Sequence, residues 1–278
     1  MNSSNPQGAS GAPHTAAVDG GQPLDSEPMH VFGSNMRGEH LTGAAAMAAR
    51  FHGAEDGVWR GPTGNAYAIP YRNADDRLLP LAELARHVAS LRQYAASKPG
   101  IALRVARFAC GRGEYLDREV APLFARMPPN CALPGLWRRV LDPEQPVRLL
   151  VCDPEGRLRE PEWQAALQRY LAINLPLWGA AGFELISVGG ARSIVAADAA
   201  ARRFKCRHRI FVENPARYGR EAAVAAEMAG VWAATHLLAL CDPDQTANPG
   251  MVRILTLATR EGLPCEELAA DGVPAGRD

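Results

Sequence analysis

Short apolar runs alternate with segments of helical periodicity along most of the chain. In residues 79–97, Leu84, Val88 and Leu91 recur every three to four positions, which is the period of an amphipathic helix. Residues 147–152 are instead a short, mostly apolar run, which is typical of a buried strand. The same reasoning predicts strands at residues 29–32, 66–70, 101–108, 147–152, 183–188, 209–212 and 236–241, and helices at 43–51, 79–97, 117–124, 161–174, 193–204, 221–232 and 251–261.

This alternation predicts an α/β protein with largely parallel strands. A polar, turn-rich linker at residues 141–146 divides the pattern into two α/β units, at residues 29–140 and 147–268. Residues 1–28 hold almost no large apolar side chain, and we expect them and residues 269–278 to be disordered tails. In parallel sheets, ligands bind outside the carboxyl ends of the strands.

Glycine-bearing and polar loops follow the predicted strands of the first unit. Glycines at 111 and 113 allow a backbone loop to approach a phosphate closely. Tyr115 is placed to stack on a base or ribose, and Asn35 to bind a sugar hydroxyl. The candidate ligand-binding residues of this first pocket are Gly33, Ser34, Asn35, Gly43, Gly111, Arg112, Gly113 and Tyr115, and the candidate catalytic residues are Asn35, Glu114 and Asp117.

Each of these residues also has a purely structural interpretation. The glycines form ordinary tight turns in many proteins, and Asn35 is a residue type that closes a local turn. Tyr115 is suited to the core, with its hydroxyl at the surface. Glu114 and Asp117 are common charges at a helix N-terminus.

A second glycine turn, Gly189-Gly190-Ala191-Arg192, separates a predicted strand from a predicted helix with Ser193 as its N-cap. The N–H groups at a helix N-terminus attract anions, and the guanidinium of Arg192 is suited to hydrogen-bond a phosphate. Asp198 is a candidate for ribose hydroxyls or for orienting Arg192, and alternatively a solvated helix residue. The other candidate ligand-binding residues of this second pocket are Arg217, Pro249 and Gly250, which lie in loops expected on the same face.

The composition of the chain argues against several classes of protein function. The chain has 278 residues, 47% hydrophobic, with a formal net charge of zero, which argues against a broad basic surface for duplex DNA. Its six cysteines include no CxxC pair and no zinc spacing, so we expect reduced thiols in a cytoplasmic protein and no metal site. The sequence shows neither a membrane span nor a signal peptide.

The first unit resembles an uncharacterised family of bacteria and phages that is often described as a phage non-structural protein. The resemblance covers residues 30–137 and rests, in order, on Val31-Phe32-Gly33-Ser34-Asn35, Gly43-Ala44-Ala45, Tyr67-Ala68-Ile69-Pro70, residues 109–115, residues 121–124 and residues 130–134. The pattern is also loosely similar to macrodomains, which bind ADP-ribose. That similarity implies a mixed sheet in which Asn35 meets the distal ribose and Gly111 to Tyr115 wrap the diphosphate. The chain departs from the pattern at Arg112 and Glu114, which are bulky and charged.

The second unit, over residues 147–268, resembles the SLOG superfamily of Rossmann-like domains. The matching residues are Gly189-Gly190-Ala191-Arg192 with Asp198, and Asn248-Pro249-Gly250. The resemblance implies a parallel sheet that binds a nucleotide. LOG-type hydrolases of this superfamily carry Pro-Gly-Gly-x-Gly-Thr-x-x-Glu, whereas here Pro249-Gly250 is followed by Met251-Val252-Arg253, so hydrolysis by that mechanism is not expected.

Together these resemblances imply that the protein binds or senses a nucleotide-derived ligand such as ADP-ribose or NAD through two pockets, in conflict between phage and host. One alternative is a hydrolase that cleaves an N-glycosidic or ADP-ribosyl bond. A second alternative is single-stranded DNA binding by the basic residues between 202 and 209, which the zero net charge disfavours. The apolar helix at 221–232 is expected either to cover a sheet or to form a homo-oligomer contact.

Overall fold

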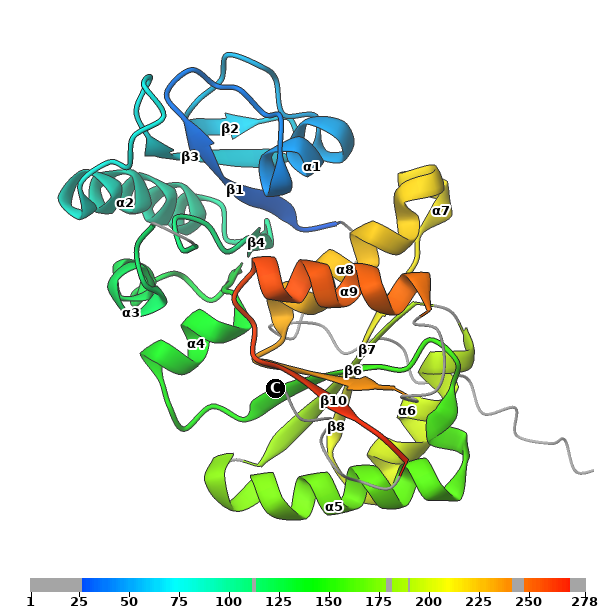
Figure 1. The fold of residues 1–278 in the computed structure, drawn as a ribbon. Helices are drawn as coiled ribbons and strands as arrows, with labels where there is room; N and C mark the ends of the chain where they lie inside the picture. Colours follow the sequence, from blue (N-terminus) through cyan, green and yellow to red (C-terminus); the bar gives the residue numbers. More distant parts are fainter. Residues whose placement is uncertain (1–26, 112–113, 179–181, 190, 242–247, 271–278) are drawn as a thin grey trace, which may run out of the picture.

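The computed structural model describes residues 27–111, 114–178, 182–189, 191–241 and 248–270, which form two five-stranded sheets flanked by helices (Figure 1). One sheet is mixed and the other is entirely parallel, which confirms the predicted α/β class. Most of the two predicted tails lies outside the described residues. Glu27, Pro28, Ala269 and Ala270 are the tail residues within them.

The first sheet has the strand order β2-β3-β1-β4-β5, and its one antiparallel pair is β2 with β3. Leu84, Val88 and Leu91 of α2 pack on one face, as their helical spacing predicts, and α1 covers the other face beside Phe32. The elements are β1 (Met29–Asn35), α1 (Gly43–His52), β2 (Gly61–Thr63), β3 (Ala66–Arg72), α2 (Leu81–Ser97), β4 (Leu103–Val105), α3 (Asp117–Val120), β5 (Cys131–Ala132) and α4 (Gly135–Leu141).

The second sheet has the order β10-β9-β6-β7-β8, and all of its strands are parallel. Its elements are β6 (Val147–Cys152), α5 (Pro161–Trp178), β7 (Phe183–Gly189), α6 (Ala191–Phe204), β8 (Arg207–Val212), α7 (Pro215–Tyr218), α8 (Ala222–Ala233), β9 (His236–Leu240), α9 (Pro249–Arg260) and β10 (Cys265–Leu268). Alternate side chains of β6 enter two separate cores. Leu149 packs with α5 and α6, whereas Leu150 packs with α8 and α9.

Helix α8 lies between the two units (Figure 1). Gly230 packs so closely on the second sheet that an added Cβ would lie 2.3 Å from a Val188 methyl carbon. Met228 and Trp232 instead form a small core with Ala106 of the first unit. The helix therefore covers a sheet, as one of the two interpretations of its apolar sequence expected. No helix within the described ranges is long and apolar enough to cross a bilayer.

Several predicted boundaries are wrong. The strand expected at residues 101–108 is only Leu103–Val105, because the chain then turns away from the sheet and Ala109 has a φ of 59°. Ser193 is not an N-cap, since α6 begins at Ala191. The helix expected at 117–124 changes to a 3₁₀ turn at Ala121, where Pro122 supplies no backbone N–H.

Four short elements carry too little pattern to be predicted. β2 contains Gly61 and Pro62, and β5 has only 2 residues. The edge strand β10 reads Cys-Glu-Glu-Leu and so lacks an apolar run. Helix α4 ends at Leu141, within the segment assigned to the linker, and buries Trp137 in the first core.

A substitution of Gly135, the first residue of α4, tests the contact between the units. An added Cβ would lie 2.3 Å from the carbonyl oxygen of Ala234, and backbone atoms cannot rotate away. We therefore expect Gly135→Ala to lower the free energy of unfolding by about 1–3 kcal/mol, measured by urea denaturation. Gly100→Ala is the control because an added Cβ there meets nothing within 4 Å. Equal stability of the two variants would contradict the close contact.

Candidate functional site

In an open sheet of parallel strands, a crevice is expected at the carboxyl end where the strand order reverses, and in the first sheet aromatic side chains fill this position. From β1 the chain continues to β3 on one side and later returns to β4 on the other, so the switch point lies between β1 and β4. A Cβ on Gly33 would lie 2.6 Å from the Cβ of Phe108 and 2.9 Å from the Tyr71 ring. Gly33 therefore makes room for packed side chains at the position expected for a ligand.

Asn35 closes a local turn. Its side-chain oxygen accepts the backbone N–H groups of Arg37 and Glu39, each at 3.1 Å, and its amide nitrogen donates to the Glu39 carboxylate. The neighbouring Ser34 is buried, and its hydroxyl donates to the carbonyl of Asn35. Gly43 begins α1 with a φ of 57° and open space around it.

Both acids proposed as catalytic residues in the first unit are ion-paired with arginines. Glu114 pairs with Arg72 at 2.5 Å. Asp117 accepts hydrogen bonds from two nitrogens of Arg107 at 2.7 and 2.8 Å and from the Trp137 indole at 2.8 Å. Burial alone would raise the pKa of Asp117, but these bonds and the charge of Arg107 hold the pKa below its usual range. A carboxylate stabilised in this way is a poor general base.

The remaining loop residues also have internal partners. The Tyr115 hydroxyl donates to the carbonyl oxygen of Leu79 at 2.8 Å, and its ring packs against the first core. An added Cβ on Gly111 would lie 2.9 Å from the Glu114 carboxylate. Arg112 and Gly113 lie outside the described residues.

In the second sheet the switch point lies between β6 and β9, and the two predicted glycine segments follow β7 and β9, the strands on either side of β6. β7 neighbours β6 on one side and ends at Gly189, whose φ of 100° favours glycine. β9 neighbours β6 on the other side, and α9 follows it with Pro249 and Gly250 in its first turn. Asn248 caps α9 by accepting the Gly250 N–H at 2.8 Å. Gly190 and the side chains of Ala191 and Arg192 lie outside the described residues.

Asp198 and Arg217 face other partners. Asp198 pairs with Arg202 on the next turn of α6, and His208 lies 3.5 Å from its carboxylate. Arg217 reaches the first unit, where it pairs with Glu27 and donates to the Phe51 carbonyl oxygen at 3.1 Å. Gly189 and Gly250 thus belong to the two strand–helix connections on either side of β6, whereas Arg217 is turned to the first unit.

An ion pair at this crevice was missed by sequence reasoning. Glu227 of α8 is buried and accepts two hydrogen bonds, each 2.6 Å, from Arg253 of α9. Cys152, the last residue of β6, lies close to this pair. Burial is the main cause that raises the pKa of its thiol; the charge of Glu227 raises it further and the charge of Arg253 lowers it. One signal was available in the sequence, because Glu227 is the only charged residue of α8.

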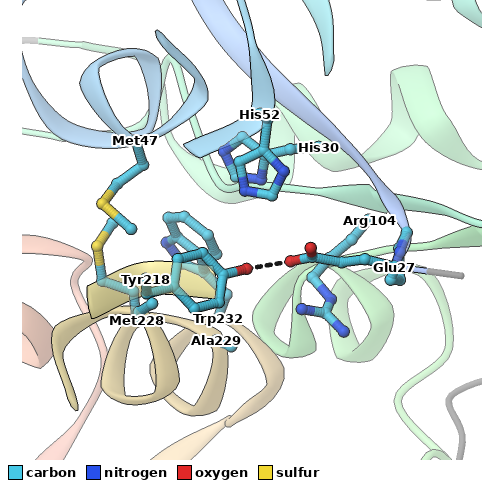
Figure 2. Close-up of a pocket in the computed structure, with 11 residues that line it drawn as sticks. Glu27, His30, Met47, His52, Arg104, Tyr218, Met228, Ala229 and Trp232 are labelled. Atoms are coloured by element: carbon cyan, nitrogen blue, oxygen red, sulfur yellow. Dashed lines mark hydrogen bonds between the residues drawn. The ribbon is translucent and has the colours of Figure 1, made fainter. Parts of the chain in front are cut away.

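A cavity lies at the seam between the units, by which we mean the surface where α7 and α8 meet β1, β4 and α1. It has a volume of about 30 Å³ and is lined by Glu27, Pro28, His30, Met47, His52, Arg104, Tyr218, Ala225, Met228, Ala229 and Trp232. Figure 2 shows the two imidazoles close together above Trp232, and the Tyr218 hydroxyl directed at the Glu27 carboxylate. The ring centroids of His30 and His52 are 4.8 Å apart.

The seam keeps both histidines neutral. Burial, together with the charge of Arg104 and the neighbouring imidazole, lowers the pKa of His30 to about 3. Burial and the charges of Arg217 and Arg104 lower the pKa of His52 to about 4. Protonation of either ring is therefore opposed by the packing of the two units.

No family model, curated protein or solved structure matches the chain. Within the described ranges, no group of three or more His, Cys, Asp or Glu side chains is arranged to hold a metal ion.

Replacing Asp117 tests whether it is structural. Asp117→Asn leaves the nearly buried Arg107 without its counter-charge. We expect a loss of about 2 kcal/mol in urea denaturation, less than the ~3–5 kcal/mol of a fully buried pair because Asp117 is 26% exposed. The control is Asp76→Asn, since Asp76 is exposed and its pair with Arg72 is long, at 3.7 Å. A loss no larger than that of the control would show that Asp117 has no structural role.

The histidines predict a pH dependence of stability. Their folded pKa values, about 3 and about 4, lie below the unfolded value of 6.5. The unfolded chain therefore binds more protons between these values, so stability is fully present above pH 6.5 and falls as the pH drops toward 4. We expect His52→Gln to reduce the slope of unfolding free energy against pH between 4.5 and 6.5, in urea titrations, by up to one proton. An unchanged slope would contradict a neutral, buried His52.

Proposed function

We propose that the protein binds a nucleotide-derived small molecule, of the ADP-ribose or NAD type, in its second unit. The binding site is the crevice outside the carboxyl ends of β6, β7 and β9. The strand order carries this proposal, because an all-parallel sheet of order β10-β9-β6-β7-β8 has its switch point between β6 and β9. Nucleotides bind at such points in open α/β sheets.

Two helix N-termini supply the attraction for phosphate. The N-termini of α6 and α9 follow the two strands that flank β6, and neither helix has an acidic residue in its first turn. Their helix dipoles therefore meet no competing carboxylate from their own helices, although Asn248 already accepts the Gly250 N–H of α9. Gly189 has no side chain, so backbone atoms are accessible to a ligand at the turn before α6.

An ion-paired arginine supplies positive charge at the crevice. Arg253 is 40% exposed, so its guanidinium can contact a phosphate while Glu227 fixes its orientation from below. Both Glu227 oxygens accept from Arg253, so the side chains at the crevice favour the phosphate part of a nucleotide-derived ligand.

The proposal is confined to the second unit and to binding. In the first unit the polar atoms of Asn35, Glu114, Asp117 and Tyr115 are engaged with protein partners. The hydrolase alternative loses support because its two acids are paired with arginines. The DNA alternative loses support because Arg202 pairs with Asp198, and Arg209 with Glu184.

Arg192 offers the sharpest test, because it occupies the second position of α6. We expect Arg192→Ala to weaken binding of the ligand about 10–100-fold, the effect of losing a hydrogen bond to a charged group worth ~1.5–3 kcal/mol. The measurement is calorimetric titration of the full chain with ADP-ribose, NAD and AMP, preceded by a thermal-shift screen of the same compounds.

Arg202→Ala is the matched control. Arg202 lies on the same helix, is 75% exposed and pairs with Asp198. It should leave affinity unchanged. If none of the nucleotides binds the unmodified protein, or if both variants lose affinity equally, binding at the crevice is refuted.

A further inference from the structure

The seam between the units already holds one oxyanion, the carboxylate of Glu27. One oxygen accepts a hydrogen bond from the Tyr218 hydroxyl and the other pairs with Arg217, so both partners come from α7 of the second unit. Arg217 is itself fixed by its bond to the Phe51 carbonyl oxygen, and Tyr218 packs edge-on against the Phe51 ring at 5.1 Å. Arg217 and Tyr218, which we call the clamp, are therefore held in position by contacts other than those to Glu27.

The same cavity has more donors than Glu27 satisfies. Arg104 of β4 lines it, and among the described residues no carboxylate pairs with this arginine, whose guanidinium lies 6.0 Å from the Phe211 ring centroid. His52 is 9% exposed, and its Nδ1 is buried without a hydrogen-bond partner in the described structure. Arg104 and Arg217 therefore face one carboxylate, and the cavity carries an excess of positive charge.

We propose that the seam is a binding site for a phosphate group, in which the phosphate replaces the Glu27 carboxylate between Arg217, Tyr218 and Arg104. Phosphate carries more charge and more acceptor atoms than a carboxylate, so it can engage Arg104 and His52 as well as the clamp. This site is separate from the crevice of the second sheet, since its residues lie where α7 and α8 meet the first unit.

The size of the cavity requires displacement of Glu27. A volume of about 30 Å³ accommodates one or two water molecules but not a phosphate beside the carboxylate. The Glu27 side chain is 22% exposed and precedes β1, so it can leave without breaking a strand pair. Glu27 thus acts as an internal competitor that weakens binding of an external phosphate.

Because the site joins both units, bound phosphate stabilises their packing. We expect thermal-shift and calorimetric titrations of the full chain with inorganic phosphate, at constant ionic strength, to show weak binding in the unmodified protein. Glu27→Ala should bind phosphate about ten-fold more tightly, because it removes both the competing group and a like charge. In the Glu27→Ala background, Arg104→Gln should reverse this gain, whereas Arg104→Lys should retain most of it.

Two controls locate the effect. Arg86→Gln removes an exposed arginine from α2, away from the seam, and should leave phosphate affinity unchanged. In the Glu27→Ala background, Arg192→Ala should leave the gain in phosphate affinity intact, which separates this site from the nucleotide crevice. If Glu27→Ala binds phosphate no more tightly than the unmodified protein, or if Arg104→Gln binds as tightly as Arg104→Lys, the proposal is overturned.

Discussion

The packing of α8 against both units is the interaction on which the rest of the structure depends. One side packs on the second sheet at Gly230, where the fit leaves no room for a Cβ. Another side carries Met228 and Trp232 into contact with Ala106 of the first unit. A helix that is apolar all round must be covered all round, and neither sheet alone can do so. The two units consequently share this helix and do not meet only through their linker.

This shared helix determines the chemistry of both candidate sites. Its buried Glu227 fixes Arg253 at the carboxyl end of β6, and its Trp232 stacks on His30 at 5.3 Å in the seam. This packing buries the imidazoles of the seam, so they stay neutral, whereas the guanidinium of Arg253 at the crevice is 40% exposed. The crevice and the seam are therefore different environments built on the same helix.

The first unit shows why polar residues in glycine-rich loops are ambiguous in a sequence. Asn35, Glu114, Asp117 and Tyr115 have the chemistry expected of a ligand pocket, yet each satisfies its polar atoms within the protein. Loops of this kind carry many unpaired backbone groups, and the same side chains that bind ligands can close turns or neutralise buried arginines. The partners, such as Arg72 and Arg107, lie on other segments, and residue spacing alone does not identify them.

The sequence by itself determined the α/β class and most helices and strands, because apolar periodicity is a local property of the chain. It also placed Gly189 and Gly250 in strand-to-helix turns, since glycine and proline act within a few residues. Only the tertiary structure decided that these turns flank β6, that Arg217 turns to Glu27 and that two histidines meet at a seam. Those contacts join residues far apart in the chain, and they follow from strand order and from the packing of α8, which no local pattern encodes.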